Sequence, residues 1–339
     1  MKTLDQAIDR HFVNGTIRHI AVRVGIGDRI ICDTFRGSID EYALFDMASV
    51  TKIIVTTTLS LIAIDKGLID LDDPVAKFYE NNKSLTIKNM LTHTMGIGHK
   101  ALNIVGNTYE NIAEKILDIP SDLPIGSDVR YSCPGFILLG KILEKVFGMR
   151  LDKCFDEIVA RPLGLKSTSF LPSNIENAVN SNLDKAKRGI VNDNNCRFLG
   201  GVAGNAGLFS NISDVTKYVA FLLCKGQPLI SEKTFEMAVK NYTEEMSEAR
   251  GLGFLYVDER YKQTGRLFSD GAIGHCGHTG QSVFCDYRTG LYAIVLSDAT
   301  ISTVRKYGEE HYGEVMKMRA DIHNAIKRDL PCFVNFQTC

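Results

Sequence analysis

Strand-like and helix-like patterns of apolar positions divide the chain into three parts. Near the start, an amphipathic pattern over 4–13 predicts a helix, and apolar runs at 19–25 and 29–35 around a glycine-containing turn predict a β-hairpin. A helix is expected from about 306 to 328, near the other end. Before it come further strand-like runs, at 253–257, 265–269, 275–285 and 291–297.

Between these parts the pattern is mainly helical. A helix that is apolar nearly all round is expected from Ser49 to Lys66, ending at Gly67 in a left-handed C-cap. Asp73 followed by Pro74 is typical of a helix start. Further helices are expected at 134–147 and 214–224.

Strands at both ends with helices between them predict an α+β fold of the α/β sandwich type. In such a fold, an antiparallel sheet built from both termini carries helices on its faces. We expect residues 1–67 and 207–339 to form this sheet domain, and residues 68–206 to form an inserted, mainly helical region.

Composition and charge narrow the class of protein. The 339 residues are 45% hydrophobic and 23% charged, which excludes a disordered chain and a coiled-coil rod. The formal charge of -1 provides no basic excess for binding nucleic acid. Nine scattered cysteines without a C-x-x-C pair indicate free thiols in a reducing compartment.

No segment predicts export or membrane insertion. The first residues lack the uninterrupted apolar region of a signal peptide, and the most apolar run, 53–64, is too short to span a bilayer. We therefore expect a cytoplasmic protein without a membrane span, whose oligomeric state is open.

The one Ser-x-x-Lys in the chain, Ser49 to Lys52, lies at the start of the apolar helix. Residues three apart share a helix face, so the serine hydroxyl and the lysine amine can meet. Burial lowers the pKa of a lysine, and such a lysine can activate a serine. Backbone N–H groups at a helix start can also hold an oxyanion. Because one such spacing is expected by chance, the motif needs support from its context.

Two other segments provide that context. Tyr131 stands just before a predicted helix, where a phenol can point into a cleft and act as a general base, although packing alone also explains a tyrosine there. In 274–282, glycines inside a strand-like run indicate close approach of a ligand. We expect no metal site, because His275 and Cys276 are adjacent strand residues and point to opposite faces.

Together these motifs resemble the serine β-lactamase and penicillin-binding-protein superfamily, in its class C-like branch of D-amino-acid peptidases and esterases. Three other segments also resemble its conserved stretches, namely 85–96, 161–165 and 200–210. The resemblance implies a β-lactamase/transpeptidase-like fold. It makes Ser49 the acylated nucleophile, Lys52 the group that helps to deprotonate it, and Tyr131 the base and then the acid.

The third motif of this superfamily allows two registers. The residue types of the triplet 278–280 resemble the motif directly. The number of residues between the motif and the turn at 286–290 instead favours His275, Cys276 and Gly277 as the match. In the favoured register, the resemblance implies an oxyanion hole made by the backbone N–H groups of Ser49 and His278. The alternative donor is Gln281.

Two cysteines depart from the pattern of the superfamily. Cys133 stands where an asparagine commonly binds the substrate amide, and Cys276 stands where threonine is common. A thiol lacks the paired donor and acceptor of an amide, so the turnover of β-lactams or D-alanyl peptides is open.

We therefore expect a serine hydrolase that acts through an acyl-enzyme on an ester, a short peptide amide or a lactam. The alternative, motivated by Cys133, is a penicillin-binding or sensing module that is acylated, or binds a peptide, without efficient turnover. Neither function requires a metal or an organic cofactor. The expected partner is a small-molecule substrate, with neither nucleic acid nor membrane.

Overall fold

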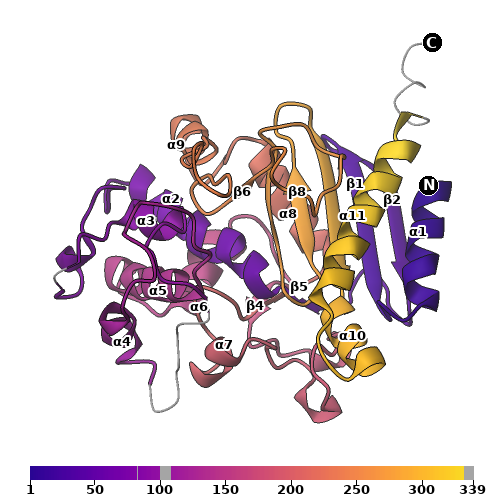
Figure 1. The fold of residues 1–339 in the computed structure, drawn as a ribbon, viewed down its shortest axis with the longest axis horizontal. Coiled ribbons are helices and arrows are strands. Elements are labelled where there is room, and N and C mark those ends of the chain that lie inside the picture. The colour runs from indigo at the N-terminus through magenta and orange to yellow at the C-terminus, as the bar shows by residue number, and fades with distance from the viewer. Residues whose placement is uncertain (82, 100–107, 332–339) are drawn as a thin grey trace.

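A computed structural model describes residues 1–81, 83–99 and 108–331. Figure 1 shows a large sheet with its helices on one side of the molecule and a mainly helical part on the other. The sheet has six antiparallel strands in the order β2-β1-β9-β8-β7-β6. Their bounds are Ile20–Ile26 (β1), Arg29–Arg36 (β2), Leu255–Tyr256 (β6), Ile273–Cys276 (β7), Ser282–Cys285 (β8) and Leu291–Ser297 (β9).

The first and last strands of the chain pair within this sheet. Ile20 of β1 lies opposite Ser297 of β9, and Ile26 lies opposite Leu291. This pairing confirms the predicted α+β sandwich, whose sheet is built from both termini. The boundaries of the inserted region, 68–206, stay a prediction.

Alternate strand residues face two different cores, as the pleat of a sheet requires. Val22 and Phe284 pack with the helices at the two chain ends, α1 (Lys2–Val13) and α11 (Tyr312–Asp329). Ala21 and Ile294 belong to the other core, which includes α8 (Ile212–Leu223). Helices therefore bury both faces of the sheet.

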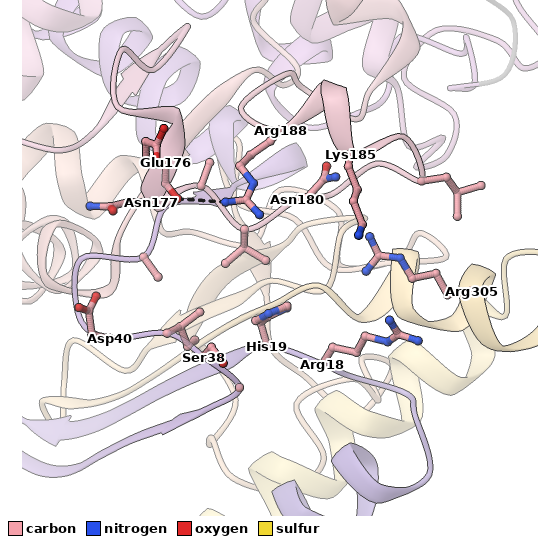
Figure 2. Close-up of a pocket in the computed structure, with 16 residues that line it drawn as sticks. Arg18, His19, Ser38, Asp40, Glu176, Asn177, Asn180, Lys185, Arg188 and Arg305 are labelled. Atoms are coloured by element: carbon pink, nitrogen blue, oxygen red, sulfur yellow. Dashed lines mark hydrogen bonds between the residues drawn. The ribbon is translucent and has the colours of Figure 1, made fainter.

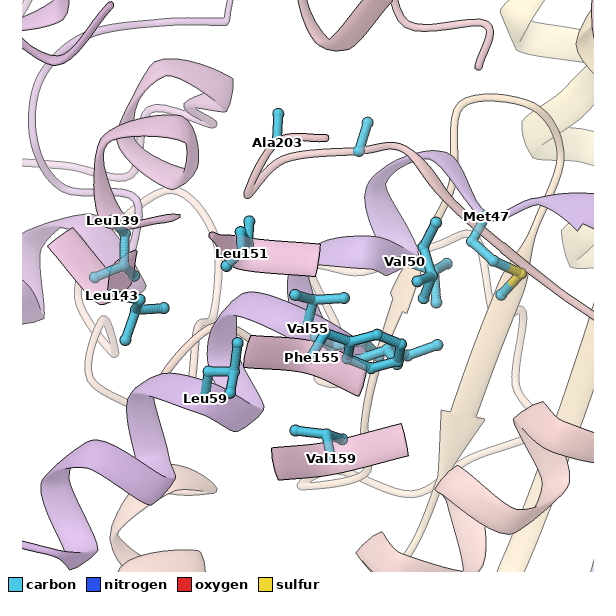
Figure 3. Packing of buried hydrophobic residues seen from close by; sticks show 14 of the residues in the cluster. Met47, Val50, Val55, Leu59, Leu139, Leu143, Leu151, Phe155, Val159 and Ala203 are labelled. Atoms are coloured by element: carbon cyan, nitrogen blue, oxygen red, sulfur yellow. The ribbon is translucent and has the colours of Figure 1, made fainter. Parts of the chain in front are cut away.

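The core that includes α8 continues into the helical part of the molecule. In Figure 3, Val55 and Leu59 of the central helix lie close to Leu143 and Phe155 of two other helices. The remaining α-helices are α2 (Thr58–Asp65), α3 (Ile87–Leu91), α4 (Ile112–Asp118), α5 (Cys133–Phe147), α6 (Leu151–Phe155), α7 (Asn194–Phe198), α9 (Glu232–Ala238) and α10 (Ala299–Tyr307).

A small sheet of three very short strands was not predicted. Its order is β3-β5-β4, from Phe45–Asp46, Leu208–Ser210 and Ser169–Phe170. Strands of two or three residues are too short to leave a period in the sequence. Their pairing nevertheless fixes the chain directly before Ser49.

The helix predicted from Ser49 is continuous but irregular. A 3₁₀ turn at Ala48–Val50 leads into a π-helical segment, Lys52–Thr57, and then into α2. Gly67 follows the end of the helix at φ +67°, as predicted. By length and composition, the segment Ala48–Asp65 could cross a membrane, so the apolar run of 53–64 that the sequence analysis judged too short is part of a longer helix. However, 83% of this segment is buried inside the protein, as in a core helix.

One of the predicted strands is absent, and another is two strands instead of one. Residues 265–269 form successive turns, because Gly265 adopts φ +54° and its N–H is bonded back to the carbonyl of Lys262. Residues 275–285 form two strands, because the Gly277 N–H donates to the Gln281 carbonyl at 2.9 Å and closes a turn.

Two helix predictions also need correction. The helix expected at 306–328 is divided into α10 and α11 by Gly308, which adopts φ +81° and ends α10. Pro74 starts no α-helix: its ψ of 141° is extended, and only a 3₁₀ turn, Val75–Lys77, follows it.

Candidate active site

Ser49 lies in the 3₁₀ turn after β3, and Asp46 holds this turn in place. The Asp46 carboxylate accepts the N–H of Ala48 at 2.9 Å and the N–H of Asn192 at 2.7 Å. Its backbone carbonyl accepts the Thr279 hydroxyl at 2.8 Å. Ala48 adopts φ +45°, which is unfavourable for a residue with a side chain. Burial raises the pKa of Asp46 to about 6. The sequence analysis missed this positioning residue.

Lys52 follows Ser49 on the same face of the helix and is fully buried. Its Nζ donates to Ser49 Oγ at 3.0 Å, to the Asn205 carbonyl at 3.0 Å and to Cys133 Sγ at 3.6 Å. The expectation of a lowered lysine pKa is wrong. Burial lowers the pKa of Lys52, but the negative charge that Cys133 and Tyr131 carry when they are ionised outweighs burial and raises this pKa. The direction of this shift favours the ammonium form of Lys52.

Tyr131 stands directly before α5, whose start is capped by the Ser132 hydroxyl. The Lys52 ammonium lies 5.0 Å from the centre of the Tyr131 ring. Burial raises the pKa of Tyr131, and the charge of Lys52 and hydrogen bonds to Lys52 and Ser49 offset only part of this rise. The structure thus brings the predicted serine, lysine and tyrosine together, with the tyrosine as a neutral phenol.

His93 packs against Tyr131 and was missed by the residue-level analysis, although the motif-like segment 85–96 contains it. The two ring centres are 4.6 Å apart. His93 Nδ1 accepts the Ser132 N–H at 3.0 Å, so the ring proton lies on Nε2. Burial, with nearby cations, holds the pKa of His93 well below its usual value. His93 is therefore a neutral positioning residue for Tyr131.

The two side chains at the end of β7 point in opposite directions. The ring of His275 faces the site, with its centre 6.1 Å from that of Tyr131. Cys276 faces the other core, where its Sγ lies 3.0 Å from the Tyr261 hydroxyl. The side chain of Cys276 therefore points away from the site, as expected for adjacent strand residues, which alternate in direction.

Gly277 lets the end of β7 approach the turn that carries Ser49. A Cβ at this position would come within 2.6 Å of the Met47 carbonyl oxygen. The Gly277 carbonyl accepts a hydrogen bond from the fully buried guanidinium of Arg319 on α11. This close approach favours the register in which His275, Cys276 and Gly277 form the third motif.

Two backbone N–H groups near this approach have no acceptor. Within the described chain, neither the N–H of Ser49 nor that of His278 donates a hydrogen bond. The side chain of His278 stacks on Tyr312, with 5.4 Å between ring centres. The backbone N–H of Gln281, the alternative donor, has no acceptor in the described chain either, so hydrogen bonding alone does not separate the two registers. His278 directly follows Gly277, which closely approaches the turn that carries Ser49, and this position favours His278 as the second donor.

Arg250 is another buried cation beside Tyr131, and no sequence motif marks it. Its side chain is 4% exposed, and its guanidinium carbon lies 5.6 Å from the centre of the Tyr131 ring. Nε donates to Glu248 at 3.1 Å, whereas Nη1 is buried without a partner among the described residues. Burial, Arg250 and Lys52 together hold the pKa of His275 well below its usual value.

The arrangement can pass a proton from a serine to a phenol while a neighbouring ammonium stabilises the negative charge. Ser49 and Tyr131 are partly exposed, so a substrate carbonyl can reach them. No group of three or more His, Cys, Asp or Glu side chains is placed to hold a metal ion in residues 1–81, 83–99 and 108–331.

The raised pKa values predict an alkaline pH dependence of kcat/KM. The pKa values of Lys52 and Tyr131 are both raised, and general-base catalysis needs one proton to leave this pair. We therefore expect kcat/KM for an ester to rise by about tenfold per pH unit below the apparent pKa of the pair, from about pH 6 upward. Rates corrected for spontaneous hydrolysis measure this. A single inflection near the usual pKa of histidine would contradict it, because His93 and His275 are neutral throughout this range.

The fold and the site define the class of β-lactamase- and transpeptidase-like proteins. The Beta-lactamase family model matches residues 4–315, and the chain belongs to this family. Curated relatives are named "Putative D-alanyl-D-alanine carboxypeptidase". The one from Escherichia coli O157:H7 is 28% identical over 309 residues, covering 77% of this chain and 70% of that protein. The one from Salmonella agona is 25% identical over 307 residues, with the same coverage.

Solved structures show the same fold. The hydrolase EstCE1, described as having promiscuous acyltransferase activity, has a TM-score of 0.75 at 19% identity, covering 96% of this chain and 98% of that one. The octameric penicillin-binding protein homologue from Pyrococcus abyssi has a TM-score of 0.70 at 20% identity, covering 91% of this chain and 77% of that one.

Proposed function

We propose that the chain is a serine hydrolase that cleaves esters through an acyl-enzyme on Ser49. The observation that carries the proposal is the 3.0 Å hydrogen bond from Lys52 Nζ to Ser49 Oγ, beside the phenol of Tyr131. Membership of the Beta-lactamase family supports hydrolysis as the class of reaction.

In the proposed mechanism, Tyr131 acts as the base once the Lys52–Tyr131 pair has lost one proton. Tyr131 takes the hydroxyl proton while Ser49 Oγ attacks the substrate carbonyl, and the Lys52 ammonium stabilises the phenolate until that proton arrives. The N–H groups of Ser49 and His278 hold the oxyanion. Tyr131 returns the proton to the leaving alcohol, which leaves an ester on Ser49. Tyr131 then deprotonates a water, which attacks that ester, and returns the proton to Ser49 Oγ as the acid leaves.

Cys133 is the reason for proposing an ester rather than an amide. Its sulfur lies in the site, 3.6 Å from Lys52 Nζ, and burial raises the pKa of its thiol, so it stays neutral. A thiol offers a weak donor and a weak acceptor, whereas an amide substrate needs strong partners for both its N–H and its C=O. We therefore expect esters to react faster than D-alanyl amides and β-lactams.

The test follows turnover and covalent modification together. The protein is incubated with p-nitrophenyl acetate and, separately, with a penicillin, and the product and the mass of the protein are measured. We expect Ser49→Ala to lose both ester turnover and any adduct. Ser127→Ala, which changes an exposed serine on a turn, should behave like the unmodified chain.

Two other outcomes of this experiment would argue against the proposed ester hydrolase. A lasting penicillin adduct on Ser49 without ester turnover would favour the binding or sensing module. Turnover that survives in Ser49→Ala would contradict the proposal, because the hydrolysis would then need a different nucleophile.

A further inference from the structure

A cavity outside the catalytic residues collects positive side chains. It has a volume of about 750 Å³, and none of Ser49, Lys52 and Tyr131 lines it. Its walls come from the segment before β1, the segment after β2, the loop 176–188 and α10. A volume of this size is typical of a small-molecule site.

Three of the positive side chains converge at one end of this cavity. Figure 2 shows Arg18, Lys185 and Arg305 reaching toward that end, while Asp40 and Glu176 lie at the other. A fourth cation, Arg188, lies apart from these three and donates to the Glu176 carbonyl at 3.2 Å. None of these three cations forms an ion pair with a carboxylate in the described chain. Like charges that converge without a carboxylate repel one another, and a bound anion removes this cost.

Most N–H donors of the cations at this end form no hydrogen bond within the described chain. Arg305 donates from Nη2 to the Asn182 carbonyl at 3.3 Å, and this is its one side-chain hydrogen bond within the described chain. The side chains of Arg18 and Lys185 make none there. A guanidinium has five N–H donors in a planar fork that matches the oxygens of a phosphate.

Buried polar side chains hold the walls in place. Asp298, which is 2% exposed, accepts the backbone N–H groups of Arg18 and His19 at 2.9 and 3.0 Å. Asn182, which is 6% exposed, donates to the carbonyls of Lys187 and Ile190 at 3.2 and 2.8 Å. The backbones that carry Arg18 and Lys185 are therefore ordered before any ligand arrives, which reduces the entropy lost on binding.

We propose that this cavity is a binding site for a small phosphorylated molecule. Its phosphoryl group lies between Arg18, Lys185 and Arg305, and its uncharged, hydroxyl-bearing part lies toward Asp40 and Glu176. The cavity is concave and the whole chain has a formal charge of -1, so the charge is local to this site rather than a surface for nucleic acid.

The test is calorimetric titration of the full chain with inorganic pyrophosphate, and with citrate as a carboxylate comparison, in about 150 mM salt to screen diffuse surface charge. We expect pyrophosphate to bind, and Lys185→Gln or Arg305→Gln to weaken it by about tenfold each, as for the loss of one charge-assisted hydrogen bond. Lys187→Gln and Lys306→Gln are the matched controls, because these neighbours of the same turn and helix do not line the cavity. Neither control should change the affinity.

Three outcomes would overturn the proposal: no binding of pyrophosphate, equal or tighter binding of citrate, or equal weakening by the control variants. Ester turnover is measured on the same samples. Because the cavity contains none of the proposed catalytic residues, either proposal can fail while the other stands.

Discussion

Replacing Lys52 by methionine is expected to lower kcat for ester hydrolysis by about 1,000-fold or more, near the upper range for acid–base groups. The Lys52 ammonium contacts Ser49 Oγ and lies over the Tyr131 ring, so it supports both the nucleophile and its base. Methionine has a similar length but no charge and no proton. Initial rates with a p-nitrophenyl ester, at several pH values, measure the loss.

The fold should survive this substitution. Replacing a buried charge by an apolar residue of similar size is often neutral or stabilising, so the melting temperature should change by a few degrees at most. Lys88→Met is the control, because Lys88 is a partly exposed lysine on α3 that pairs with Asp72 at the surface. A variant that keeps its thermal transition and stays within about tenfold of the original kcat would contradict a catalytic role for Lys52.

Local patterns predicted those parts of the fold and the site that local forces determine. The spacing of Ser49 and Lys52 brings two side chains together because residues three apart share a helix face. The helix after Tyr131 was recognisable from Pro134 at its start and Gly148 at its end, and Gly148 adopts φ +68° as expected of a C-cap.

The missed residues of the site have partners far away in the sequence. Asp46 binds the N–H of Asn192, which is 146 positions later, and His93 accepts an N–H from Ser132, 39 positions later. Periodicity indicates that a side chain is buried but not what it contacts. A buried polar residue such as Arg250 is therefore invisible to the pattern until the fold shows its neighbours.

The same limit explains the single strand predicted at 275–285. Nearly all of its residues are buried, including those of the turn, so no polar break in the pattern marks the reversal. The reversal is made by long-range contacts instead. The side chains of Thr279 and Gln281 both donate to the carbonyl of Asp46, which anchors the turn beside the Ser49 segment.

Replacing Tyr131 by phenylalanine is expected to lower kcat by about 100- to 1,000-fold, which lies within the usual range for removing a general base. Phenylalanine keeps the ring that packs 4.6 Å from His93 and 5.0 Å from the Lys52 ammonium, so the site should keep its shape. Tyr42→Phe, at a tyrosine that is 60% exposed, is the matched control and should leave kcat unchanged.

The pH profile of Tyr131→Phe separates a base from a packing residue. Tyr131 is one of the groups that raise the pKa of Lys52 against burial, so its removal lets burial lower that pKa. We expect the residual activity to depend on pH with an inflection at lower pH than in the unmodified chain. If Tyr131 only packs, both kcat and the inflection will stay where they were. If kcat is unchanged in this variant but lost in Lys52→Met, the base is the neutral amine of Lys52, and the mechanism proposed above assigns the proton to the wrong member of the pair.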